Sequence, residues 1–508
     1  MLQLHTPEQA ARWLQTQVTG TLRTDSRKLQ PGDGFLAWPG AAVDARAHVA
    51  AALAAGAAAC LVEASGSEAF AWDDPRVACL RGLKAASGPL ASAYFGEPSH
   101  ALHLLAVTGT NGKTSSAWWL AQALSNLKQP APMSCGFVGT LGIGVPPDVV
   151  STGLTTPDPV ALHAALAGFV AQGLQACAME ASSIGIAEHR MDGAQIHTAL
   201  LTNLTQDHLD YHGNMEAYWQ AKARLFAWPG LRAAVINVDD PYGAALAQSL
   251  STSAQPGALD IWAVSMQPGT GNRARLQAQG IDYRGGGMRF DLVEGGESVP
   301  LATHLMGDYN VANLLGVVAG LRTLGVSLAA AAEACAALTP VPGRMECVSL
   351  PGQPLVAVDY AHTPDALAKA LDALKPVAAQ RGGQLWCVFG CGGDRDTSKR
   401  PLMGAMAAGH AERVMVTSDN PRSESADAII SQILLGVVGA PQVMVEPDRA
   451  RAIANVLAQA SAADVVLVAG KGHEDYQETA GVRRPFSDLE QARTGLQARP
   501  AGLEGAAP

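Results

Sequence analysis

The sequence predicts an α/β protein whose parallel sheets belong to more than one domain. Short apolar runs that end in Gly, Asp, Asn or Ser alternate with alanine-rich helical stretches along almost the whole chain. This rhythm is typical of parallel strands that are buried on both faces and covered by helices. The chain has 508 residues, of which 48% are hydrophobic. Its length and apolar content therefore suit about two to four separately packed domains.

The predicted strands follow one another as apolar runs of similar length. They are LHLLAVTG, IHTALLTNL, AAVINVDD, LVAVDYA, LWCVFG, ERVMVTSDN and DVVLVAGKG. In open parallel sheets, ligands bind beyond the carboxyl ends of the strands. Polar residues that directly follow these runs are therefore the candidates for a functional site.

Two breaks divide the chain into three blocks. The stretch GEPSHALHLL contains Gly, Pro and Ser before a strand, and LTPVPGRMECV has two prolines and a glycine between a helix and a strand. We therefore expect domains at residues 1–98, 99–339 and 340–508. The chain after about residue 497 lacks periodicity and is expected to be a flexible tail.

The composition argues against several classes of protein. The net charge is −10 and no basic run occurs, which disfavours nucleic acid or an anionic membrane surface as a partner. No apolar stretch reaches about 18 residues, and the first residues lack the pattern of a signal peptide, so we expect a cytoplasmic protein without membrane insertion. The eight cysteines are scattered without a zinc-binding pattern and are expected to be reduced thiols.

The stretch AVTGTNGKTSSAWW resembles a phosphate-binding loop between a strand and a helix, although Val107 stands where the common pattern has glycine. Backbone N–H groups of such a turn, together with the helix N-terminus, form a cradle for phosphates. Lys113 would reach the outer phosphates, and the Thr114 hydroxyl would bind Mg²⁺. The residues expected at the nucleotide are Gly109, Thr110, Asn111, Gly112, Lys113, Thr114 and Ser115.

Two further strand ends carry groups that bind metal ions or phosphates. Glu180 ends the apolar run in CAMEASS, where a carboxylate would meet Mg²⁺. Asp207 and His208 follow another run, in TNLTQDHLDYHG, and suit a second Mg²⁺ ligand or a phosphate contact better than zinc, for which a third ligand is missing. Lys222 lies in the helix that follows and, taken alone, has the character of a solvated lysine.

Three strand ends in the last block combine charges of both signs. Arginine binds a carboxylate through paired hydrogen bonds, and Asp or Glu binds an ammonium group. The mixture predicts a zwitterionic ligand that resembles an amino acid. The residues are Arg395, Lys399 and Arg400 after the first strand, Asp419, Asn420, Pro421 and Arg422 after the second, and Lys471, His473 and Glu474 after the third.

Motifs spread over almost the whole chain resemble those of the Mur ligase family. They are VTGTNGKT, MEASS, TNLTQDHLDYHG, MGDYNVANLL, GRME, VDYAHTPDAL, FGCGGDRDTSKRP, SDNPRSE and GKGHEDYQ, and the opening RTDSRKLQPGDGFLAWPG resembles the family's UDP-binding domain. The resemblance implies a central P-loop ATPase domain with a parallel sheet. It is flanked by a UDP-binding α/β domain and a Rossmann-like C-terminal domain.

Within the family, D-N-P-R resembles the motif that selects diaminopimelate. The resemblance then implies that the enzyme adds meso-diaminopimelate to the D-Glu γ-carboxylate of UDP-MurNAc-L-Ala-D-Glu during peptidoglycan synthesis. ATP would convert that carboxylate into an acyl phosphate, which the amine attacks. The implied cofactors are two Mg²⁺ ions, the partners are these small molecules, and the implied oligomeric state is a monomer.

The resemblance also assigns roles to residues. Lys222 matches a carbamylated lysine (N6-carboxylysine), which would bind metal as an anion together with Thr114, Glu180 and His208; the implied catalytic residues are Lys113, Glu180, His208 and Lys222. Those implied near ATP are also Asn313, Arg344 and Asp359. Those implied at the UDP-muramoyl-peptide are Ser26, Ala41, Ala42, Val43, Thr155, Thr156, Ser182, Glu188 and Arg190. Those implied at diaminopimelate are Arg395, Asp419, Asn420, Pro421, Arg422, Gly470 and Glu474.

The chain departs from the family pattern at three positions. Ile184 stands where a histidine is common, Glu188 stands where a glutamine is expected, and Leu154 replaces a polar residue. The alternatives are an L-lysine-adding ligase, a folylpolyglutamate synthase and a nucleotide-regulated binding protein without catalysis. Arg422 argues against the first, the UDP-like N-terminus against the second, and the intact set that includes Lys222 against the third.

Overall fold

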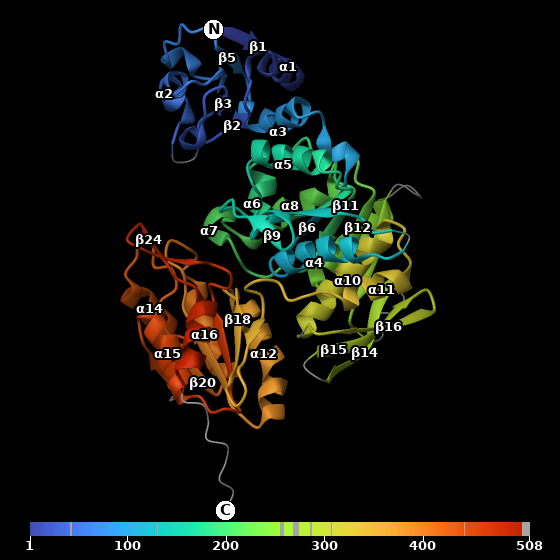
Figure 1. Ribbon diagram of the computed structural model, residues 1–508, viewed down its shortest axis with the longest axis vertical. Coiled ribbons are helices and arrows are strands. Elements are labelled where there is room, and N and C mark those ends of the chain that lie inside the picture. The colour runs from blue at the N-terminus through green and yellow to red at the C-terminus, as the bar shows by residue number, and fades with distance from the viewer. Residues whose placement is uncertain are drawn as a thin grey trace, which may run out of the picture.

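The computed structural model describes residues 1–40, 43–129, 131–253, 259–267, 274–284, 287–305, 307–440 and 442–499. The described residues form three α/β units, each built on one main sheet, and Figure 1 shows them as separate blue, cyan-to-yellow and orange-to-red bodies. The predicted α/β fold class is confirmed. Among the described residues, no helix has both the length and the apolar character needed to cross a bilayer.

The N-terminal unit is a parallel sheet with helices on both faces and the strand order β1-β5-β4-β3-β2. Its helix α1 begins after Thr6, whose side chain accepts a hydrogen bond from the Gln9 N–H, and Pro7 occupies the first helical position. The strands are β1 (Leu2–Leu4), β2 (Leu22–Arg23), β3 (Gly34–Ala37), β4 (Ala59–Glu63) and β5 (Val77–Leu80), and the helices are α1 (Pro7–Gln17), α2 (Val49–Ala54) and α3 (Leu83–Tyr94).

The central unit holds the longest sheet, in the order β16-β15-β14-β13-β12-β11-β6-β10-β7-β8-β9. Its middle is parallel, whereas both ends continue as antiparallel strands. The strands are β6 (His103–Thr108), β7 (Cys135–Gly139), β8 (Gly142–Val145), β9 (Asp148–Val150), β10 (Ala176–Glu180), β11 (Thr198–Leu201), β12 (Ala233–Asn237), β13 (Asp260–Ser265), β14 (Leu276–Arg284), β15 (Gly287–Glu294) and β16 (Glu297–Thr303).

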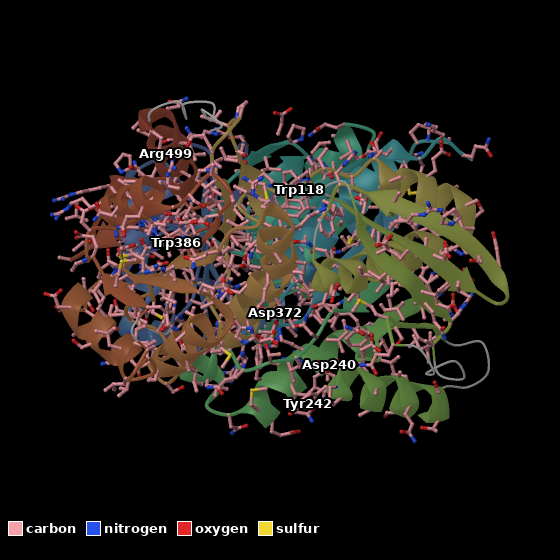
Figure 2. All side chains as sticks on the ribbon, turned by 90° about the horizontal axis from the view of Figure 1, so that it is seen from below. Trp118, Asp240, Tyr242, Asp372, Trp386 and Arg499 are labelled. Atoms are coloured by element: carbon pink, nitrogen blue, oxygen red, sulfur yellow. The ribbon has the colours of Figure 1, made fainter. Side chains whose placement is uncertain are left out.

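Helices cover the central sheet on both sides. They are α4 (Lys113–Asn126), α5 (Pro159–Ala171), α6 (Ser183–Ala187), α7 (Leu209–His212), α8 (Met215–Ala223), α9 (Pro241–Ser253), α10 (Asp308–Thr323) and α11 (Leu328–Ala336). One core includes Trp118 of α4, which is 2% exposed, meets Phe137 edge to face, and is labelled within this unit in Figure 2. The long parallel strands are apolar along their whole length because both faces are covered.

The C-terminal unit has the strand order β17-β18-β22-β19-β20-β21, with β17 antiparallel to the rest and a separate β23-β24 hairpin. Trp386 of β19 is buried in it and donates to Asp464 at 3.0 Å. The strands are β17 (Glu346–Val348), β18 (Leu355–Asp359), β19 (Leu385–Phe389), β20 (Arg413–Val416), β21 (Val443–Val445), β22 (Val465–Ala469), β23 (Tyr476–Thr479) and β24 (Val482–Pro485). The helices are α12 (Pro364–Arg381), α13 (Lys399–His410), α14 (Ala426–Leu434), α15 (Arg449–Gln459) and α16 (Asp488–Ala498).

The order of the strands brings the candidate residues together. In the central sheet β6 lies between β10 and β11, so the P-loop, Glu180 and the segment after β11 emerge side by side. In the C-terminal sheet β22 lies between β18 and β19, and β20 follows β19, so Asp359, Gly470 and Asp419 emerge at one edge. The predicted tail after residue 497 falls mostly outside the described residues, and α16 continues to Ala498.

Candidate active site

A cavity of about 1120 Å³ lies between the central and C-terminal units. Its central side is lined by the P-loop from Thr110 to Ser115 together with Glu180, Asp207, His208 and Lys222. Its C-terminal side is formed by Arg344, Asp359, Tyr360, His362 and one face of α12. A concave site with converging charged groups is the usual form of a substrate site.

The P-loop owes its shape to two glycines in left-handed backbone conformations. Gly109 has φ +143°, and a Cβ there would lie 1.9 Å from the Thr202 hydroxyl oxygen. Gly112 has φ +83°, and a Cβ there would lie 2.3 Å from the Asn313 side-chain oxygen. Asn203, after β11, holds the loop by accepting hydrogen bonds from the backbone N–H groups of Thr110 and Asn111 at 2.9 and 3.0 Å. No residue with a side chain therefore fits at either position.

Two lysines converge on one carbonyl oxygen of this loop. Lys113 Nζ donates to the carbonyls of Gly109 and Thr110 at 3.0 and 2.8 Å, and Lys222 Nζ donates to Gly109 at 2.7 Å. Lys222 is 1% exposed and lies 4.5 Å from the centre of the Tyr218 ring. Burial lowers the pKa of both lysines, and the Lys113 charge lowers that of Lys222 further. Two cations at one point favour an anion between them.

Glu180 is fully buried at the end of β10 and faces this cavity. Its carboxylate accepts hydrogen bonds from the Thr140 N–H at 2.7 Å and the Thr140 hydroxyl at 3.3 Å. A Cβ at Gly139 would lie 2.4 Å from the same carboxylate, so the chain has glycine where the carboxylate needs room. Thr140 thus fixes the direction of Glu180.

Asp207 and His208 lie where the central unit meets the C-terminal unit. His208 has a left-handed backbone with φ +53°, which is uncommon outside glycine. The Asp207 carboxylate lies 3.5 Å from His208, 3.9 Å from His362 and 3.8 Å from Lys399. Burial alone would raise the pKa of Asp207, but the charges of these three partners hold it well below its usual range. Asp207 is therefore an anion shared between the two units.

The donor groups suit a magnesium ion that arrives with a nucleotide. No three His, Cys, Asp or Glu side chains of the described residues gather into a ready metal cluster. Glu180, His208 and Thr114 nevertheless line the same cavity. Mg²⁺ in proteins is typically bound by one or two carboxylates together with substrate phosphates and water. The residues present fit that pattern.

The C-terminal unit closes the nucleotide side of the cavity with Arg344, directly before β17. Its guanidinium donates to the Thr114 hydroxyl at 3.0 Å and stacks 4.3 Å above the Tyr360 ring, while Nε is buried without a partner. Asp359 accepts the N–H groups of Met345 and Ala361 at 2.7 and 2.8 Å, and burial raises its pKa. Asn313, on α10, contacts Gly112. Arg344 and Asn313 therefore lie against the P-loop, and Asp359 lines the same cavity.

The residues predicted to bind the muramoyl-peptide form a chain of hydrogen bonds next to Glu180. Thr155 accepts from Thr140 at 3.0 Å, and Thr156 donates to the Glu180 carbonyl at 2.8 Å. The Ser182 N–H donates to the Thr156 hydroxyl at 3.0 Å, and Arg190 donates to the Thr156 carbonyl at 3.0 Å. The structure therefore groups these four residues beside Glu180, and Thr155 and Ser182 among them line the cavity.

Glu188 has partners from two other parts of the molecule. Lys84, on α3 of the N-terminal unit, lies 2.6 Å from its carboxylate, and the Tyr211 hydroxyl donates to it at 2.5 Å. Burial raises the pKa of Glu188, but these hydrogen bonds and the Lys84 charge leave it below its usual value. Glu188, which stands in place of a glutamine, therefore remains an anion whose charge is balanced by Lys84.

The residues predicted to bind UDP lie in the N-terminal unit and do not line the cavity. Ser26 begins a short 3₁₀ helix (Ser26–Lys28), and Val43 is exposed. Ala41 and Ala42 lie outside the described residues. Of this group, the described residues Ser26 and Val43 do not line the cavity that holds the P-loop.

The residues predicted to bind an amino acid meet at the carboxyl ends of β19, β20 and β22. Arg422 Nη1 lies 3.0 Å from a Cβ built at Gly392, and the Arg395 Cγ lies 3.8 Å from it, so both arginines flank one glycine. Arg422 also donates to the Gly393 carbonyl at 2.7 Å. Opposite them, Asn420 donates to Glu474 at 2.6 Å. Arg395 and Arg422 thus lie at the same strand ends as the acidic residues Asp419 and Glu474, and a zwitterion requires groups of both signs.

This pocket and the nucleotide cavity share a wall. A Cβ at Gly343, next to Arg344, would lie 2.0 Å from the His473 backbone nitrogen, and a Cβ at Gly472 would lie 2.6 Å from the Gly343 carbonyl. The Tyr360 ring packs between Arg344 and His473, with the His473 ring centre 5.2 Å away. The two sites are therefore in direct backbone contact.

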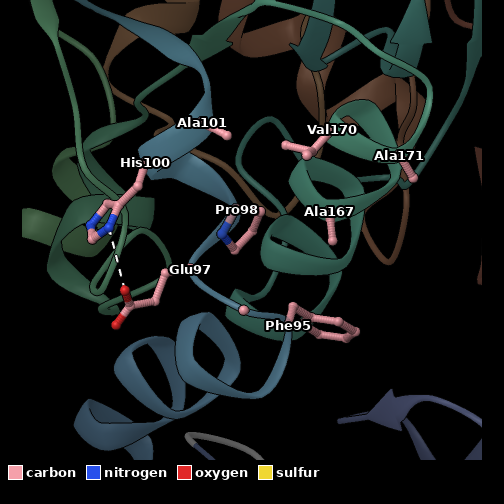
Figure 3. Close-up of a pocket in the computed structure, with 9 residues that line it drawn as sticks. Phe95, Glu97, Pro98, His100, Ala101, Ala167, Val170 and Ala171 are labelled. Atoms are coloured by element: carbon pink, nitrogen blue, oxygen red, sulfur yellow. Dashed lines mark ion pairs between the residues drawn. The ribbon is translucent and has the colours of Figure 1, made fainter.

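A second hollow, of about 490 Å³, lies between the segment that follows α3 (residues 95–101) and the end of α5, and none of the predicted site residues lines it. Figure 3 shows Phe95, Pro98 and Val170 along it, with a 3.3 Å ion pair between His100 and Glu97 at one side. It lies where the chain passes from the N-terminal to the central unit.

Sequence reasoning missed several supporting residues. Thr140 lies outside the quoted motifs, and Asn203 lies in TNLTQDHLDYHG but had no assigned role; their contacts with Glu180 and the P-loop reveal them. Asp365 in HTPDAL, which accepts a hydrogen bond from Asn111 at 3.0 Å, was within a quoted motif but had no assigned role. An acidic residue in the first turn of a helix was the one available signal.

Comparisons with known proteins show which family the chain resembles. Family models of the Mur ligase middle domain and of the Mur ligase glutamate ligase domain match residues 107–321 and 343–472. The UDP-N-acetylmuramoyl-L-alanyl-D-glutamate–2,6-diaminopimelate ligase of Acidovorax sp. (strain JS42) is 62% identical over 499 residues, which cover 98% of each chain. The ligase of that name from Pseudomonas aeruginosa is 47% identical and covers 94% of this chain and 95% of its own.

Solved structures give the same picture. A structure of a ligase of that name has 36% sequence identity and a TM-score of 0.63, and the match covers 94% of each chain. A crystal structure of MurF from Acinetobacter baumannii has 19% identity and a TM-score of 0.66, with 96% of this chain and 98% of that chain covered. The second similarity shows a shared fold.

Proposed function

The chain belongs to the Mur ligase family, and from this premise we propose that it joins meso-2,6-diaminopimelate to UDP-N-acetylmuramoyl-L-alanyl-D-glutamate with the use of ATP. The enzyme forms an amide bond in peptidoglycan synthesis. One observation carries the proposal: a P-loop cavity with Lys113 and the buried Lys222 shares the Tyr360 wall with a cluster in which two arginines lie near acidic groups.

The first step is the transfer of the ATP γ-phosphoryl group to the D-Glu γ-carboxylate. A carboxylate is a poor acylating agent because its leaving group would be oxide, and phosphorylation gives it phosphate as a leaving group. Two anions must meet, so the site has to offset their repulsion. Lys113 and the P-loop N–H groups hold the phosphates, and Arg344 approaches from the other unit. Bound Mg²⁺, of which we propose two ions, would supply further positive charge.

Lys222 is proposed to act as its carbamate. Its Nζ already lies 2.7 Å from the Gly109 carbonyl and beside the Lys113 charge. Carbamylation replaces a buried cation by an anion, which removes the repulsion between two lysines and adds a metal ligand. Thr114, Glu180 and His208 are the other proposed ligands.

In the second step, the amine of diaminopimelate attacks the acyl phosphate and phosphate leaves. Arg395 and Arg422 hold the far carboxylate, Asp419 and Glu474 hold the far ammonium group, and Asn420 supports Glu474 through a 2.6 Å hydrogen bond. Gly470 is required here because a Cβ would lie 2.4 Å from the Asp419 carboxylate. Thr155, Thr156, Ser182 and Arg190 are proposed to bind the muramoyl-peptide beside Glu180, with Ser26 and Val43 at the UDP end. We also propose domain boundaries near residues 98 and 339, a monomer, and a cytoplasmic site of action where UDP-linked substrates and ATP occur.

L-lysine is the competing substrate, and the two arginines near Gly392 favour diaminopimelate over it. Lysine lacks the far carboxylate, so Arg422 would be left without its partner at a cost of about 2 kcal/mol, or roughly thirtyfold in affinity. We expect phosphate release from ATP, with UDP-MurNAc-L-Ala-D-Glu present, to depend on meso-diaminopimelate and to be far slower with L-lysine. In Arg422→Ala, the KM for diaminopimelate should rise far more than that for ATP.

The experiment offers both amino acids side by side to the wild type and to Arg422→Ala. Equal rates with both amino acids would contradict the proposed specificity. Absence of phosphate release with either amino acid would contradict the ligase activity itself. An equal rise of the KM values for diaminopimelate and ATP in the variant would show that Arg422 does not bind diaminopimelate specifically.

A further inference from the structure

A buried lysine lies in the amino-acid pocket without an assigned role. Lys471 follows β22 and is 0% exposed. Its Nζ donates to the Asn420 side-chain oxygen at 3.1 Å and to Glu474 Oε2 at 3.0 Å. The Tyr476 ring lies 5.4 Å from the same Nζ. A lysine that is fully removed from water costs folding free energy unless its charge is paired, so its place indicates a specific function.

Lys471 fixes the orientation of the Asn420 amide. The Asn420 oxygen accepts from Lys471 and from the Glu478 N–H at 2.9 Å, so it has two donors. The amide nitrogen must then point the other way, where it donates to Glu474 Oε2 at 2.6 Å. Only one of the two amide orientations satisfies all of these groups.

The same contacts leave one oxygen of Glu474 open. Oε2 receives both the Asn420 amide and the Lys471 ammonium, whereas Oε1 receives no hydrogen bond from any described residue. A carboxylate oxygen at the edge of a pocket, held still by two donors on its twin, is an acceptor for a ligand N–H.

The charges of the pocket leave room for one cation. Around Glu474, the carboxylates of Asp419 and Glu474 face the one positive charge of Lys471, because Arg449 is paired with Asp488 at 2.7 Å with both side chains fully buried, and Arg395 and Arg422 are proposed to bind the far carboxylate of the substrate. The other titratable groups that act on Glu474 or feel its charge are Tyr360, Tyr476 and Arg483. An added ammonium group would balance the remaining charge.

We propose that Lys471 is a positioning residue, which locks Asn420 and Glu474 so that Glu474 Oε1 faces the far ammonium group of the amino-acid substrate. This inference rests on the proposed diaminopimelate ligase activity. Lys471 does not touch the reacting atoms. Its effect is confined to the far end of diaminopimelate, where L-lysine has the amine but lacks the carboxylate.

Lys471 also affects the ionisation of Glu474. Burial and the Asp419 carboxylate raise the pKa of Glu474, and the Lys471 charge opposes them. Without Lys471 the pKa of Glu474 would rise further, so its anion would be lost at a higher pH. The acid limb of the pH profile of kcat/KM for diaminopimelate would then move to higher pH.

The test compares Lys471→Met with the wild type on two substrates, meso-diaminopimelate and 2-aminopimelate, which keeps both carboxylates but lacks the far amine. We expect the KM for diaminopimelate to rise about tenfold or more, while the KM values for 2-aminopimelate, ATP and the UDP-linked substrate change little. The acid limb for diaminopimelate should also shift upward in pH. Lys375→Met, which removes an exposed lysine from α12, is the matched control and should behave as the wild type.

Equal penalties on diaminopimelate and 2-aminopimelate, or none on either, would overturn the role of Lys471 while the ligase activity of the wild type still stood. Failure of the wild type to use diaminopimelate would instead refute the proposed function. Circular dichroism shows whether Lys471→Met folds, and if it does not, Lys471→Gln, which keeps a polar N–H, is judged by the same comparison of substrates.

Discussion

The carbonyl oxygen of Gly109 is the point at which the groups of the central unit converge. Lys113 and Lys222 both donate to it, from the start of α4 and from the end of α8. Two ammonium groups at one acceptor repel each other. An anion bound beside both of them offsets this repulsion. The phosphates of ATP supply one such anion, and a carbamate on Lys222 would supply another.

Lys222→Ala is therefore expected to lose nearly all ATP-dependent amide formation, because the anionic metal ligand is gone. Added short-chain carboxylates such as acetate or propionate should restore part of the activity, since they can occupy the volume and carry the charge. Phosphate release measured against carboxylate concentration checks this. Lys375→Ala serves as the control and should respond to neither change. Full activity of Lys222→Ala without any additive would refute the carbamate role.

Single residues differ in how well the sequence reveals them. Gly109 and Gly112 were identified because a strand, a tight turn and Lys-Thr form a local pattern, and the contacts with Thr202 and Asn313 give the reason for each glycine. The local sequence predicts that Lys222 is an ordinary surface lysine, because its burial depends on residues more than a hundred positions away. No local pattern contains that information.

At the scale of elements, two loops of the C-terminal unit are tied by a buried arginine. Arg400, in the first turn of α13, is fully buried and binds Glu424, from the loop before α14, through both of its terminal nitrogens at 2.8 and 2.7 Å. It also donates to the Gly392 carbonyl at 3.2 Å. Arg400 therefore holds together the loops that carry Arg395 and Arg422, and its guanidinium is bound to Glu424 rather than free for the ligand carboxylate that the sequence predicted.

This ion pair predicts a pH dependence of stability. Hydrogen bonds from Arg400 lower the pKa of Glu424 to about 2 from its ordinary value of 4.5. A depressed carboxyl pKa stabilises the fold above the unfolded value, and the stabilisation is lost as the pH falls from about 4.5 towards 2. The unfolding free energies of wild type and Glu424→Gln should therefore differ at neutral pH and converge in acid.

Urea unfolding at neutral pH and at about pH 3 measures this difference. Glu333→Gln is the control, since its partner Lys128 is 74% exposed and surface pairs contribute about 0–1 kcal/mol at any pH. A difference between wild type and Glu424→Gln that stays constant across the pH range would contradict the assigned pKa.

Parallel strands in the middle of the central and C-terminal sheets could be predicted, whereas the antiparallel strands could not. β10 and β22 are buried along their full length, so each appears as an unbroken apolar run. β15 alternates between buried and exposed positions at its middle, and β8 and β9 are short and rich in glycine or polar residues. Such strands have a weak signal because only one face is covered.

At the scale of the whole molecule, the central and C-terminal units are joined by polar contacts around the P-loop. Asn111 donates to Asp365, the first-turn carboxylate of α12, at 3.0 Å. Gln206 donates to Ser398 at 3.3 Å, and Asp207 is shared with His362 and Lys399. Contacts of this kind suit units that separate and close again, because polar groups remain well solvated when they part.

Asp365→Ala should shift the molecule towards a more open arrangement. The lost hydrogen bond contributes about 1 kcal/mol, which corresponds to a roughly fivefold larger open population. Small-angle X-ray scattering should show a larger radius of gyration than for the wild type. Asp372→Ala is the control, because Asp372 lies on the same helix and pairs with His410 of its own unit at 2.7 Å. Equal radii for wild type and Asp365→Ala would show that this contact does not hold the units together.

The arrangement of the units was beyond the reach of the sequence. The breaks near residues 98 and 339 separate three sheets, but nothing in the composition of HTPDAL or TNLTQDH indicates that these stretches face each other. Contacts between units depend on a few side chains at long separation, whereas a strand or helix is specified by its own periodicity.

Gly343 and Gly472 touch through their backbones, so the loop that carries Arg344 and the loop that carries Lys471 and Glu474 cannot shift independently. Binding at one site should then change the binding free energy at the other site, and this change is the coupling free energy. Thermodynamic reciprocity requires that ATP alter the affinity for diaminopimelate by the same factor by which diaminopimelate alters the affinity for ATP. We therefore expect each substrate to change the affinity for the other through this contact.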